Sequence, residues 1–549
     1  MNVAQAVVNC LEQLGVKRIY GLIGTSILDF IDALRDSRIR YVSTRHEQVA
    51  ASMADAEGRL TGKPGVAVVH AGPGFLNALI SVAMAYKDSS PMLLIAGAVK
   101  RRLAGLDSWL EVPQREIIKP MVKAAFRIDK PSQVTDAVAE AYSLAMSQPP
   151  GPVFIEVPED VWSMSSEAKP CEPRPAPPPY ASPEDVKKVA ELLERAERPI
   201  ILAGGGVNTE EGYRLLVSLA ERLSIPVAVT GNGRGAFPED HPLFLGRAGF
   251  GGGNIVADRA LLMADLVLAL GAGLSDVTTY GYNYTPRGDV VAVNLDPLAE
   301  RKPIVYALRL NADAVDFLRK LSAVEIRRQR AESWLRTIEE IRREWELYLQ
   351  EALSRRYTGF VNPSKFFHEL DKALPRDFIM TGGQGMHIVY TFAFIRVRSP
   401  RGYLAAFNLG AMGFAFPAAL GAKLTYPQRD VYAVLGDGEF MMTVQDLETA
   451  VREKIGVKII VINDNAYRVL YARQKAQKMG RIYGTVHTNP DFVKLAEAFG
   501  VEAMSISSDA EIDKAIRFIT EPAERPKLLE LKIHPDDMPP MNIDGALKF

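Results

Sequence analysis

Two short apolar segments that each end in an acidic turn constrain the fold of this chain more than any other feature. Residues 431–435 run into a Gly-Asp-Gly triplet at 436–438, and residues 457–462 run into an Asn-Asp-Asn triplet at 463–465. Between them, residues 440–453 place apolar side chains at helical spacing, so the segment is predicted to form a strand, a helix and a second strand. Such a crossover brings the carboxyl ends of both strands to one edge of a parallel sheet, where ligands of α/β domains bind.

Asp437 and Asp464 are therefore expected to lie close together and to bind a metal ion that carries a diphosphate. Mg²⁺ prefers oxygen ligands and commonly leaves positions open for phosphate oxygens and water. Gly436 and Gly438 would let the backbone approach the phosphates. A lone Gly-Asp-Gly triplet also closes many ordinary turns, so this interpretation depends on the paired strands.

A second informative segment lies near the N-terminus. Residues 39–44 are strand-like and lead through Glu47 into a helix with apolar residues on one face. Residues 65–70 form another strand-like stretch that enters a Gly-Pro-Gly turn at 72–74 and then a helix containing Asn77. An acidic residue at a helix start can simply complement the helix dipole, so Glu47 alone does not indicate a site.

Together these segments resemble the cofactor motifs of the thiamine diphosphate enzymes. The resemblance implies that Mg²⁺ is bound by the carboxylates of Asp437 and Asp464 and by the backbone carbonyl of Ala466. The usual motif ends in Asn-Asn and this chain has Asn-Asp, so Asn463 or Asn465 stays open as the second side-chain ligand.

The same resemblance assigns catalytic roles to two further residues. Glu47 would activate the cofactor's pyrimidine ring as a neutral carboxylic acid, which requires apolar burial. Met412 would act as a wedge beneath the thiazolium ring, although core packing is the commoner role of a buried methionine. The remaining positions that the resemblance assigns to the cofactor are Gly72, Pro73, Asn77, Gln384, Gly410, Gly436, Gly438, Glu439 and Tyr467.

The gross properties of the chain exclude several classes of protein. Its net charge is −1 and it has no basic stripe, so nucleic acid is not an expected partner. Cys10 and Cys171 suggest neither a disulfide framework nor a zinc cluster. No signal-like N-terminus or membrane-length apolar run is present, so we expect a cytoplasmic protein with no membrane partner.

The length of 549 residues accommodates three domains. A proline-rich stretch at 168–183 is predicted to be a linker. The charged segment 324–356 is predicted to form an amphipathic connecting helix. The fold class is predicted to be α/β, with three doubly wound parallel-sheet domains. These are a pyrimidine-binding domain at 1–168, a central Rossmann-like domain at 183–323 and a diphosphate-binding and Mg²⁺-binding domain at 357–540.

This domain order resembles the acetolactate synthase and pyruvate oxidase group. The resemblance implies a carboligase or carbon–carbon lyase acting on a 2-oxo acid such as pyruvate. It also implies a homodimer or homotetramer, with Glu47 of one chain facing Asp437 of another. Residues 119–127 and 271–274 instead resemble oxalyl-CoA decarboxylases and 2-hydroxyacyl-CoA lyases, which remain an alternative. A catalytically silent subunit of the same fold is a remote alternative.

The substrate pocket is the least determined part of the sequence. Gln114, Lys123, Arg468 and Arg473 are candidate contacts for a substrate carboxylate or for specificity. Each is equally compatible with an ordinary polar or charged residue without a functional role.

The sequence supports FAD binding by the central domain and a central domain without any ligand equally well. The glycine turns at 204–206 and 249–253 resemble the FAD pocket of acetolactate synthases. The arginine that this pocket would supply after the strand ending at Leu270 is replaced by Gly273. A Rossmann-like domain that is packed without any ligand is the alternative.

Overall fold

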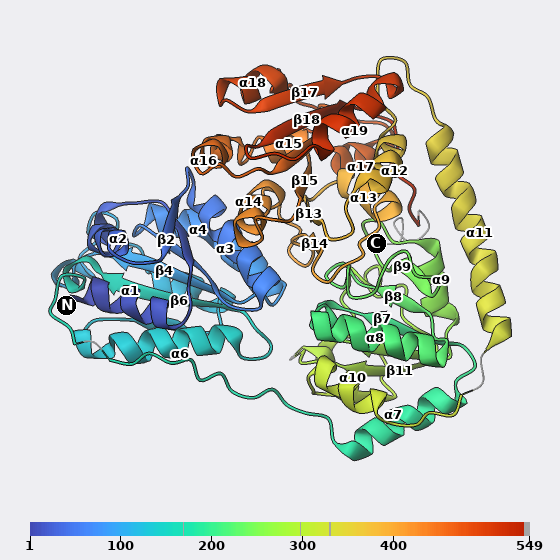
Figure 1. Ribbon diagram of the computed structural model, residues 1–549, viewed down its shortest axis with the longest axis horizontal. Coiled ribbons are helices and arrows are strands. Elements are labelled where there is room, and N and C mark those ends of the chain that lie inside the picture. The colour runs from blue at the N-terminus through green and yellow to red at the C-terminus, as the bar shows by residue number, and fades with distance from the viewer. Residues whose placement is uncertain (168, 297, 329–330, 543–549) are drawn as a thin grey trace.

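The computed structural model describes residues 1–167, 169–296, 298–328 and 331–542. Within these residues the strands form three six-stranded sheets, and neighbouring strands in each sheet are parallel (Figure 1). This confirms the predicted α/β fold class with three doubly wound domains. The sheets lie within the domains predicted at 1–168, 183–323 and 357–540, whose boundaries remain predictions.

The first sheet has the strand order β2-β1-β3-β4-β6-β5. Its order reverses between β1 and β3, so a crevice is expected at the carboxyl ends of those strands. The strands are β1 (Arg18–Gly21), β2 (Arg40–Ser43), β3 (Gly65–Val69), β4 (Met92–Ala98), β5 (Ala125–Arg127) and β6 (Pro152–Pro158). The helices are α1 (Val3–Gln13), α2 (Leu28–Arg35), α3 (Glu47–Thr61), α4 (Pro73–Lys87), α5 (Gln114–Ile118) and α6 (Val134–Met146).

The central sheet has the order β12-β11-β10-β7-β8-β9, which is the order of dinucleotide-binding Rossmann domains. The strands are β7 (Pro199–Ala203), β8 (Val227–Val229), β9 (Phe244–Arg247), β10 (Leu266–Leu270), β11 (Asp289–Val293) and β12 (Leu308–Leu310). The helices are α7 (Pro183–Arg195), α8 (Glu210–Leu223), α9 (Ile255–Met263) and α10 (Ala314–Ser322).

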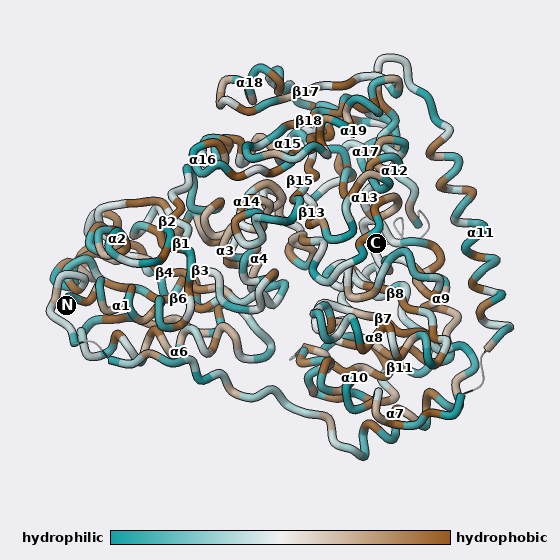
Figure 2. Tube along the Cα trace, in the orientation of Figure 1, coloured by the Kyte–Doolittle hydropathy of each residue, from teal (hydrophilic) through white to brown (hydrophobic). Residues whose placement is uncertain are grey.

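Helix α11 (Glu332–Ser354) connects the central domain to the third, as the charged segment predicted. It buries Trp334 and Trp345 along one face, and Figure 2 shows hydrophobic and hydrophilic residues alternating along it. Although α11 has 23 residues, neither it nor any other helix in the described part of the chain is long and apolar enough to cross a membrane.

The third sheet has the order β14-β13-β15-β16-β18-β17, the same relative order as the first, and it reverses between β13 and β15. The strands are β13 (Ile379–Gly382), β14 (Tyr403–Leu404), β15 (Val431–Gly436), β16 (Lys458–Asn463), β17 (Glu502–Ile506) and β18 (Lys527–Lys532). The helices are α12 (Pro363–Ala373), α13 (His387–Phe394), α14 (Ala415–Thr425), α15 (Asp437–Phe440), α16 (Leu447–Arg452), α17 (Arg468–Gln477), α18 (Phe492–Ala498) and α19 (Ile512–Thr520).

The predicted strand-helix-strand unit is present, but its helix is divided. The chain leaves α15 after Phe440 and reaches α16 through a 3-10 turn at Val444–Asp446. The backbone of Thr443 has φ −135°, far from helical values, which interrupts the run. Strands β15 and β16 are nevertheless parallel neighbours, so their carboxyl ends meet as expected.

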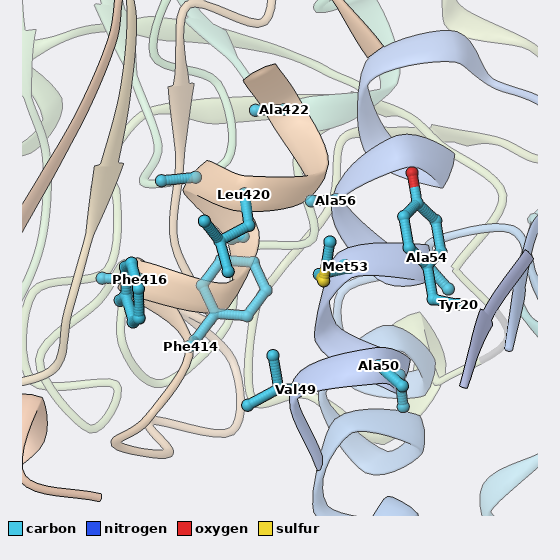
Figure 3. Packing of buried hydrophobic residues seen from close by; sticks show 14 of the residues in the cluster. Tyr20, Val49, Ala50, Met53, Ala54, Ala56, Phe414, Phe416, Leu420 and Ala422 are labelled. Atoms are coloured by element: carbon cyan, nitrogen blue, oxygen red, sulfur yellow. The ribbon is translucent and has the colours of Figure 1, made fainter. Parts of the chain in front are cut away.

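The first and third domains share one continuous apolar core across helices α3 and α14. Val49 and Met53 of α3 face Phe414 and Leu420 in Figure 3, and all four side chains are buried. Gly421 permits this close approach, because a Cβ atom there would lie 2.5 Å from the carbonyl oxygen of Met53. Helix α3, which begins at Glu47, and helix α14, which follows the Met412 loop, are therefore held side by side.

Cys10 and Cys171 are paired, which corrects the expectation that they suggest no disulfide. Cys10 lies in α1, and the disulfide joins it to Cys171 with their Cα atoms 5.2 Å apart. The backbone N–H of Cys171 also donates to the side chain of Gln13 at 2.9 Å. A separation of 161 residues gave no local pattern from which to predict the pair.

Candidate functional site

A cavity of about 750 Å³ lies at the carboxyl end of the third sheet, where the strand order reverses between β13 and β15. Its size falls in the range of small-molecule sites, and its wall is mainly apolar. One side of the wall belongs to the central domain. The lining includes twelve of the predicted residues: Gln384, Gly410, Met412, Gly436, Asp437, Gly438, Glu439, Asp464, Ala466, Tyr467, Arg468 and Arg473.

Asp437 sits at the end of β15 and is almost completely buried. Its carboxylate accepts hydrogen bonds from the backbone N–H of Gly438 at 2.8 Å, the backbone N–H of Asn465 at 2.8 Å and the side chain of Asn489 at 2.7 Å. Burial raises the pKa of Asp437, and these hydrogen bonds oppose the rise. The residue is thus fixed in place while its charge remains only partly compensated.

Asp464 follows β16 and also lines the cavity. Burial raises its pKa to about 6, the Arg468 guanidinium opposes this rise, and the nearby charge of Asp437 adds to it. Asn463, an alternative metal ligand, is occupied instead: its amide nitrogen donates to Glu530 at 2.6 Å and its oxygen accepts from Asn465 and Asn489. Asp464 lines the cavity and Asn463 does not, so the geometry favours Asp464 over Asn463 as the second side-chain ligand.

Glu439 is buried beneath the cavity and holds two loops together. One oxygen accepts from the backbone N–H of Gln384 at 2.7 Å. The other accepts from three consecutive backbone N–H groups, those of Gly413 at 3.0 Å, Phe414 at 3.2 Å and Ala415 at 3.3 Å. Burial raises the pKa of Glu439 to about 7, although all four hydrogen bonds favour its charged form. Glu439 thereby fixes the loop that carries Met412.

Met412 lines the cavity between two glycines in left-handed conformations, Gly410 with φ 70° and Gly413 with φ 88°. An L-residue with a side chain rarely adopts these angles, so the turn requires glycine on both sides. Gln384 also lines the cavity, and its side-chain amide donates to the carbonyl of Ala406 at 3.1 Å. The structure thus presents Met412 to the cavity on a constrained turn.

Tyr467 and Gly438 meet at the edge of the same cavity. A Cβ atom on Gly438 would lie 2.7 Å from the ring of Tyr467, so only glycine allows the ring to approach. The ring of Tyr467 also contacts that of His487, with centroids 4.9 Å apart. His487 in turn lies 3.3 Å from the carboxylate of Asp437.

Glu47 lies in the first domain and does not line this cavity within the described residues. It is the first residue of α3 and is 6% exposed, with its carboxylate accepting from the side chain of Asn77 at 3.0 Å. The next residue, Gln48, reaches the carbonyl of Gly413 at 3.5 Å. The start of α3 and the Met412 loop therefore meet within one chain, and the pairing of Glu47 with Asp437 of another subunit remains a prediction.

Gly72 and Pro73 form the turn that begins α4. Gly72 has φ 63°, and a Cβ atom there would lie 2.4 Å from the carbonyl oxygen of Leu110. The buried side chain of Gln114 accepts from the N–H of Gly72 at 2.9 Å and donates to the carbonyl of Gly97 at 3.0 Å. Gln114, a candidate substrate contact, therefore stabilises this turn.

Lys123, another candidate, also has partners of its own. Its ammonium group donates to the carbonyl oxygens of Ser147 and Pro149. Burial lowers the pKa of Lys123 to about 8. Both contacts lie within the first domain, away from the residues that line the cavity.

The donor set at this edge of the third sheet fits a divalent metal ion that carries a diphosphate. Two carboxylates, those of Asp437 and Asp464, line one cavity with Ala466, and the charge of the first raises the pKa of the second. No cluster of three or more acidic, histidine or cysteine side chains suited to a metal occurs among the described residues. Such a site would take its other oxygen ligands from phosphate and water, as Mg²⁺ commonly does.

Several residues of the site were not found from the sequence. Asn489 joins Asp437 to Asn463 and Asn465, yet it lies in a loop without a ligand-like pattern. Arg247 and Phe250 line the cavity from the central domain, whereas the sequence linked the glycine turn at 249–253 only to flavin. Contacts between domains carry no periodic signal, so these residues needed the structure.

Comparison with family models matches all three domains. The model described as "Thiamine pyrophosphate enzyme, N-terminal TPP binding domain" matches residues 1–122. The corresponding central-domain model matches residues 186–321, and the C-terminal TPP binding domain model matches residues 383–531.

Similar proteins cover the whole chain. A probable acetolactate synthase large subunit of Methanocaldococcus jannaschii is 35% identical, over 100% of this chain and 94% of that protein. The acetolactate synthase large subunit of Corynebacterium glutamicum is 32% identical over 98% of this chain and 87% of its own length. The acetolactate synthase isozyme 3 large subunit of Escherichia coli is 30% identical over 99% of this chain and 97% of its own length.

Proposed function

We propose a reaction for this chain from the premise that it belongs to the thiamine pyrophosphate enzymes, in the family of the acetolactate synthase large subunits. The chain is a thiamine diphosphate-dependent carboligase that takes pyruvate as donor, releases CO₂ and joins the remaining two carbons to a second 2-oxo acid. The observation that carries this proposal is the apolar cavity that Asp437, Asp464 and Met412 line together.

Different residues of the chain would have different roles in the proposed reaction. Thiamine diphosphate, when bound, supplies the electron sink for loss of CO₂. Glu47 would hydrogen-bond the pyrimidine ring through its carboxyl group, and Asn77 donates to that group and fixes its orientation. Met412 supports the cofactor from the turn that Glu439 holds in place. The apolar wall of the cavity excludes water from the reacting carbon.

Mg²⁺ is part of the proposal, with Asp437, Asp464 and the carbonyl of Ala466 as its protein ligands. Their common position on the cavity wall and the raised pKa of both carboxyl groups support it, because a cation would stabilise their charged forms. We also propose a cytoplasmic homodimer or homotetramer in which Glu47 of one chain serves the cavity of another.

Flavin remains an open prediction. Of the two glycine turns that suggested it, the one at 204–206 is already explained by packing, because a Cβ atom on Gly204 would lie 2.2 Å from the carbonyl oxygen of Gly271. A Cβ atom on Gly206 would lie 2.8 Å from the Cα atom of Gly271, so this pair of glycines also approaches closely. The visible absorbance of the purified protein decides whether FAD is bound.

The test of the proposed function is direct assay of the purified full-length protein with thiamine diphosphate and Mg²⁺. Pyruvate is expected to give acetolactate and CO₂, and the Glu47→Gln variant is expected to lose this activity by several orders of magnitude. Oxalyl-CoA and a 2-hydroxyacyl-CoA are assayed in parallel. Turnover of either one in place of pyruvate would replace the carboligase with an acyl-CoA decarboxylase or lyase. No turnover by wild type, with Glu47→Gln indistinguishable from it, would indicate a catalytically silent subunit.

A further inference from the structure

Two polar side chains, those of Ser26 and His70, lie at the carboxyl edge of the first sheet and have no role in the reaction proposed above. Ser26 belongs to the 3-10 turn Thr25–Ile27, which follows β1, and His70 comes directly after β3. The strand order reverses between β1 and β3, so both residues lie where a doubly wound domain binds its ligand. Glu47, which follows β2 at the start of α3, reaches the same edge.

Ser26 fixes the position and the tautomer of the His70 ring. The Nδ1 atom of His70 lies 2.8 Å from the hydroxyl oxygen of Ser26 and accepts from the backbone N–H of Ser26 at 3.4 Å. A backbone N–H can only donate, so Nδ1 is an acceptor and carries no proton. The hydroxyl oxygen accepts from the N–H of Ala71 at 3.0 Å, and the indole N–H of Trp162 donates to the carbonyl of Ser26 at 2.9 Å. The proton of the neutral His70 ring is therefore on Nε2.

Two glycines let the His70 ring pack close to Glu47. A Cβ atom on Gly24 would lie 2.3 Å from the Cγ atom of His70, so only glycine leaves room for the ring. A Cβ atom on Gly74 would lie 3.1 Å from the Cβ atom of His70 and 3.0 Å from a carboxylate oxygen of Glu47. The side chains of His70 and Glu47 are therefore neighbours around one backbone position.

The His70 ring is uncharged near pH 7. Burial lowers its pKa, and the carboxylates of Glu47 and Glu159 oppose this decrease without reversing it. The ordinary pKa of a histidine is about 6.5, so His70 is neutral at pH 7 and above. It offers a ligand an N–H donor and no positive charge.

The Nε2 atom of His70 is free to bind a ligand. Among the residues that the structure describes, none forms a hydrogen bond with Nε2, and the side chain is partly exposed. His241 shows the contrasting case of a histidine with a structural role. Its Nδ1 atom accepts from the N–H of Leu243 at 3.1 Å, and its Nε2 atom lies 3.2 Å from the carboxylate of Glu221. Both ring nitrogens of His241 thus have partners, whereas His70 has one unused donor.

The chemistry of this donor defines the group that it suits. A neutral imidazole N–H binds an oxygen atom and stabilises negative charge that develops on that atom. In the proposed reaction the keto oxygen of pyruvate is such an atom. When the keto carbon is attacked, one bond forms at that carbon and the π electrons of the C=O bond move to the oxygen, which then takes up a proton.

We propose that the Nε2–H group of His70 donates a hydrogen bond to the keto oxygen of the donor 2-oxo acid and stabilises the negative charge that this oxygen gains. This inference rests on the proposed carboligase function. The oxygen takes up its proton from water, so His70 loses no proton and keeps its tautomer through the reaction. Ser26 is a positioning residue, because it acts through the His70 ring.

The kinetic test removes the donor and then restores it. His70→Phe keeps a ring without a donor, and His70→Gln places an amide N–H near the position of Nε2. His70→Phe is expected to lower kcat/KM for pyruvate by about a hundredfold or more, as the loss of a donor to a developing oxyanion does. His70→Gln should regain about tenfold of this loss, and thiamine diphosphate should bind both variants within about twofold of wild type. The matched control, His241→Gln, should keep the kcat/KM of wild type.

The pH profile distinguishes hydrogen bonding from proton transfer. A group that stays neutral adds no ionisation to kcat/KM above its own pKa, so wild type and His70→Gln should have profiles of the same shape from about pH 7 to about pH 9. If His70 donated a proton, wild type would lose activity as pH rises through the pKa of His70, and His70→Gln would not. That difference would overturn the proposal.

A binding measurement tests the hydrogen bond apart from catalysis. Pyruvate and propanoate have the same carboxylate, but propanoate has no keto oxygen. With thiamine diphosphate and Mg²⁺ present, ligand-observed NMR gives their dissociation constants in Glu47→Gln, which blocks turnover, and in Glu47→Gln combined with His70→Phe. The second change should weaken pyruvate binding by about threefold to tenfold and leave propanoate binding unchanged. This difference without any conversion of pyruvate by wild type would overturn the proposed function and leave the hydrogen bond standing.

Two further results would overturn the inference. One is a wild-type kcat/KM in His70→Phe, and the other is equal weakening of pyruvate and propanoate binding, which would mean that His70 does not contact the keto oxygen. If circular dichroism shows that His70→Phe does not fold, Ser26→Ala replaces it, because this variant keeps the ring and removes the hydroxyl that holds Nδ1. Ser26→Ala is expected to lower kcat/KM about fivefold with propanoate binding unchanged. A wild-type kcat/KM in Ser26→Ala would then contradict the proposal.

Discussion

The carboxylate of Asp464 lies 2.7 Å from the guanidinium of Arg468, so a predicted metal ligand is paired with a cation of its own chain. Arg468 also donates to the backbone carbonyls of His534 and Asp537, in the segment that follows β18. Arg468 therefore links the predicted metal ligand Asp464 to the segment after β18, which also lines the cavity. This arrangement also explains why Arg468, a substrate candidate, is occupied in the structure.

Replacement of Arg468 by methionine is expected to lower the free energy of unfolding by about 3 kcal/mol in the absence of Mg²⁺, because the buried Asp464 carboxylate loses its partner. Mg²⁺ with thiamine diphosphate should stabilise this variant more than it stabilises wild type, since the metal supplies the missing positive charge. Chemical denaturation with and without both ligands measures this difference. Arg473→Met is the control, and an equal loss of stability in that exposed variant would contradict the argument.

Glu439 offers a test of how the Met412 loop is held. Glutamine at position 439 turns one acceptor oxygen into a donor that faces backbone N–H groups. The lost hydrogen bond and the donor–donor contact should together cost about 2 kcal/mol. Calorimetric titration is expected to show thiamine diphosphate binding weakened by about tenfold or more. The exposed Glu497→Gln variant should bind as wild type does, and unchanged affinity in Glu439→Gln would remove Glu439 from the positioning role.

The sequence was sufficient to predict what depends on local pattern. Strands that end in Gly-Asp-Gly or Asn-Asp-Asn turns alternate with helices, and right-handed crossovers between parallel strands leave few topologies. For this reason the common location of Asp437 and Asp464 followed from the strand spacing, while the three-domain fold followed from the length, the composition and the family resemblance. The central strand order also agrees with the Rossmann-like prediction.

The sequence was insufficient where a residue's role depends on its neighbours in space. Gln114 and Lys123 are polar residues near a predicted site, yet the first supports the Gly72 turn and the second caps backbone carbonyls of its own domain. Arg247 is the last residue of an ordinary strand, and its place on the cavity wall depends on several segments that are distant in sequence. The pairing of Cys10 with Cys171 depends in the same way on the path of the linker.

The contact between the first and third domains should depend on pH through Asp446. Its carboxylate accepts from the N–H of Arg45 at 2.8 Å and from Thr449 at 2.7 Å, while its other oxygen has no partner among the described residues. Burial raises its pKa to about 6, above an unfolded value of about 3.9. The stabilisation that protonation provides is therefore present below about pH 4 and is lost as pH rises through about 6.

Asp446→Asn is neutral at every pH, so it should be more stable than wild type by about 2 kcal/mol at pH 8 and nearly equal to it at pH 4. Urea denaturation at both pH values measures the difference, in which other titrating groups cancel. The exposed Asp513→Asn variant is the control and should show no such trend. A stability gain that is the same at pH 4 and pH 8 would mean that Asp446 does not change its protonation state between these pH values, which would contradict the prediction.

Mixing two inactive variants tests whether the active site is shared between subunits. If Glu47 of one chain serves the Asp437 cavity of another, a mixed dimer of Glu47→Gln and Asp437→Asn chains has one site with both changes and one intact site. Random reassociation makes about half of the dimers mixed, so about a quarter of wild-type activity should return. If both residues act within one chain, as the contact of Gln48 with Gly413 would allow, every site carries one change and no activity returns. Each variant refolded alone is the control, and size-exclusion chromatography confirms that mixed oligomers form.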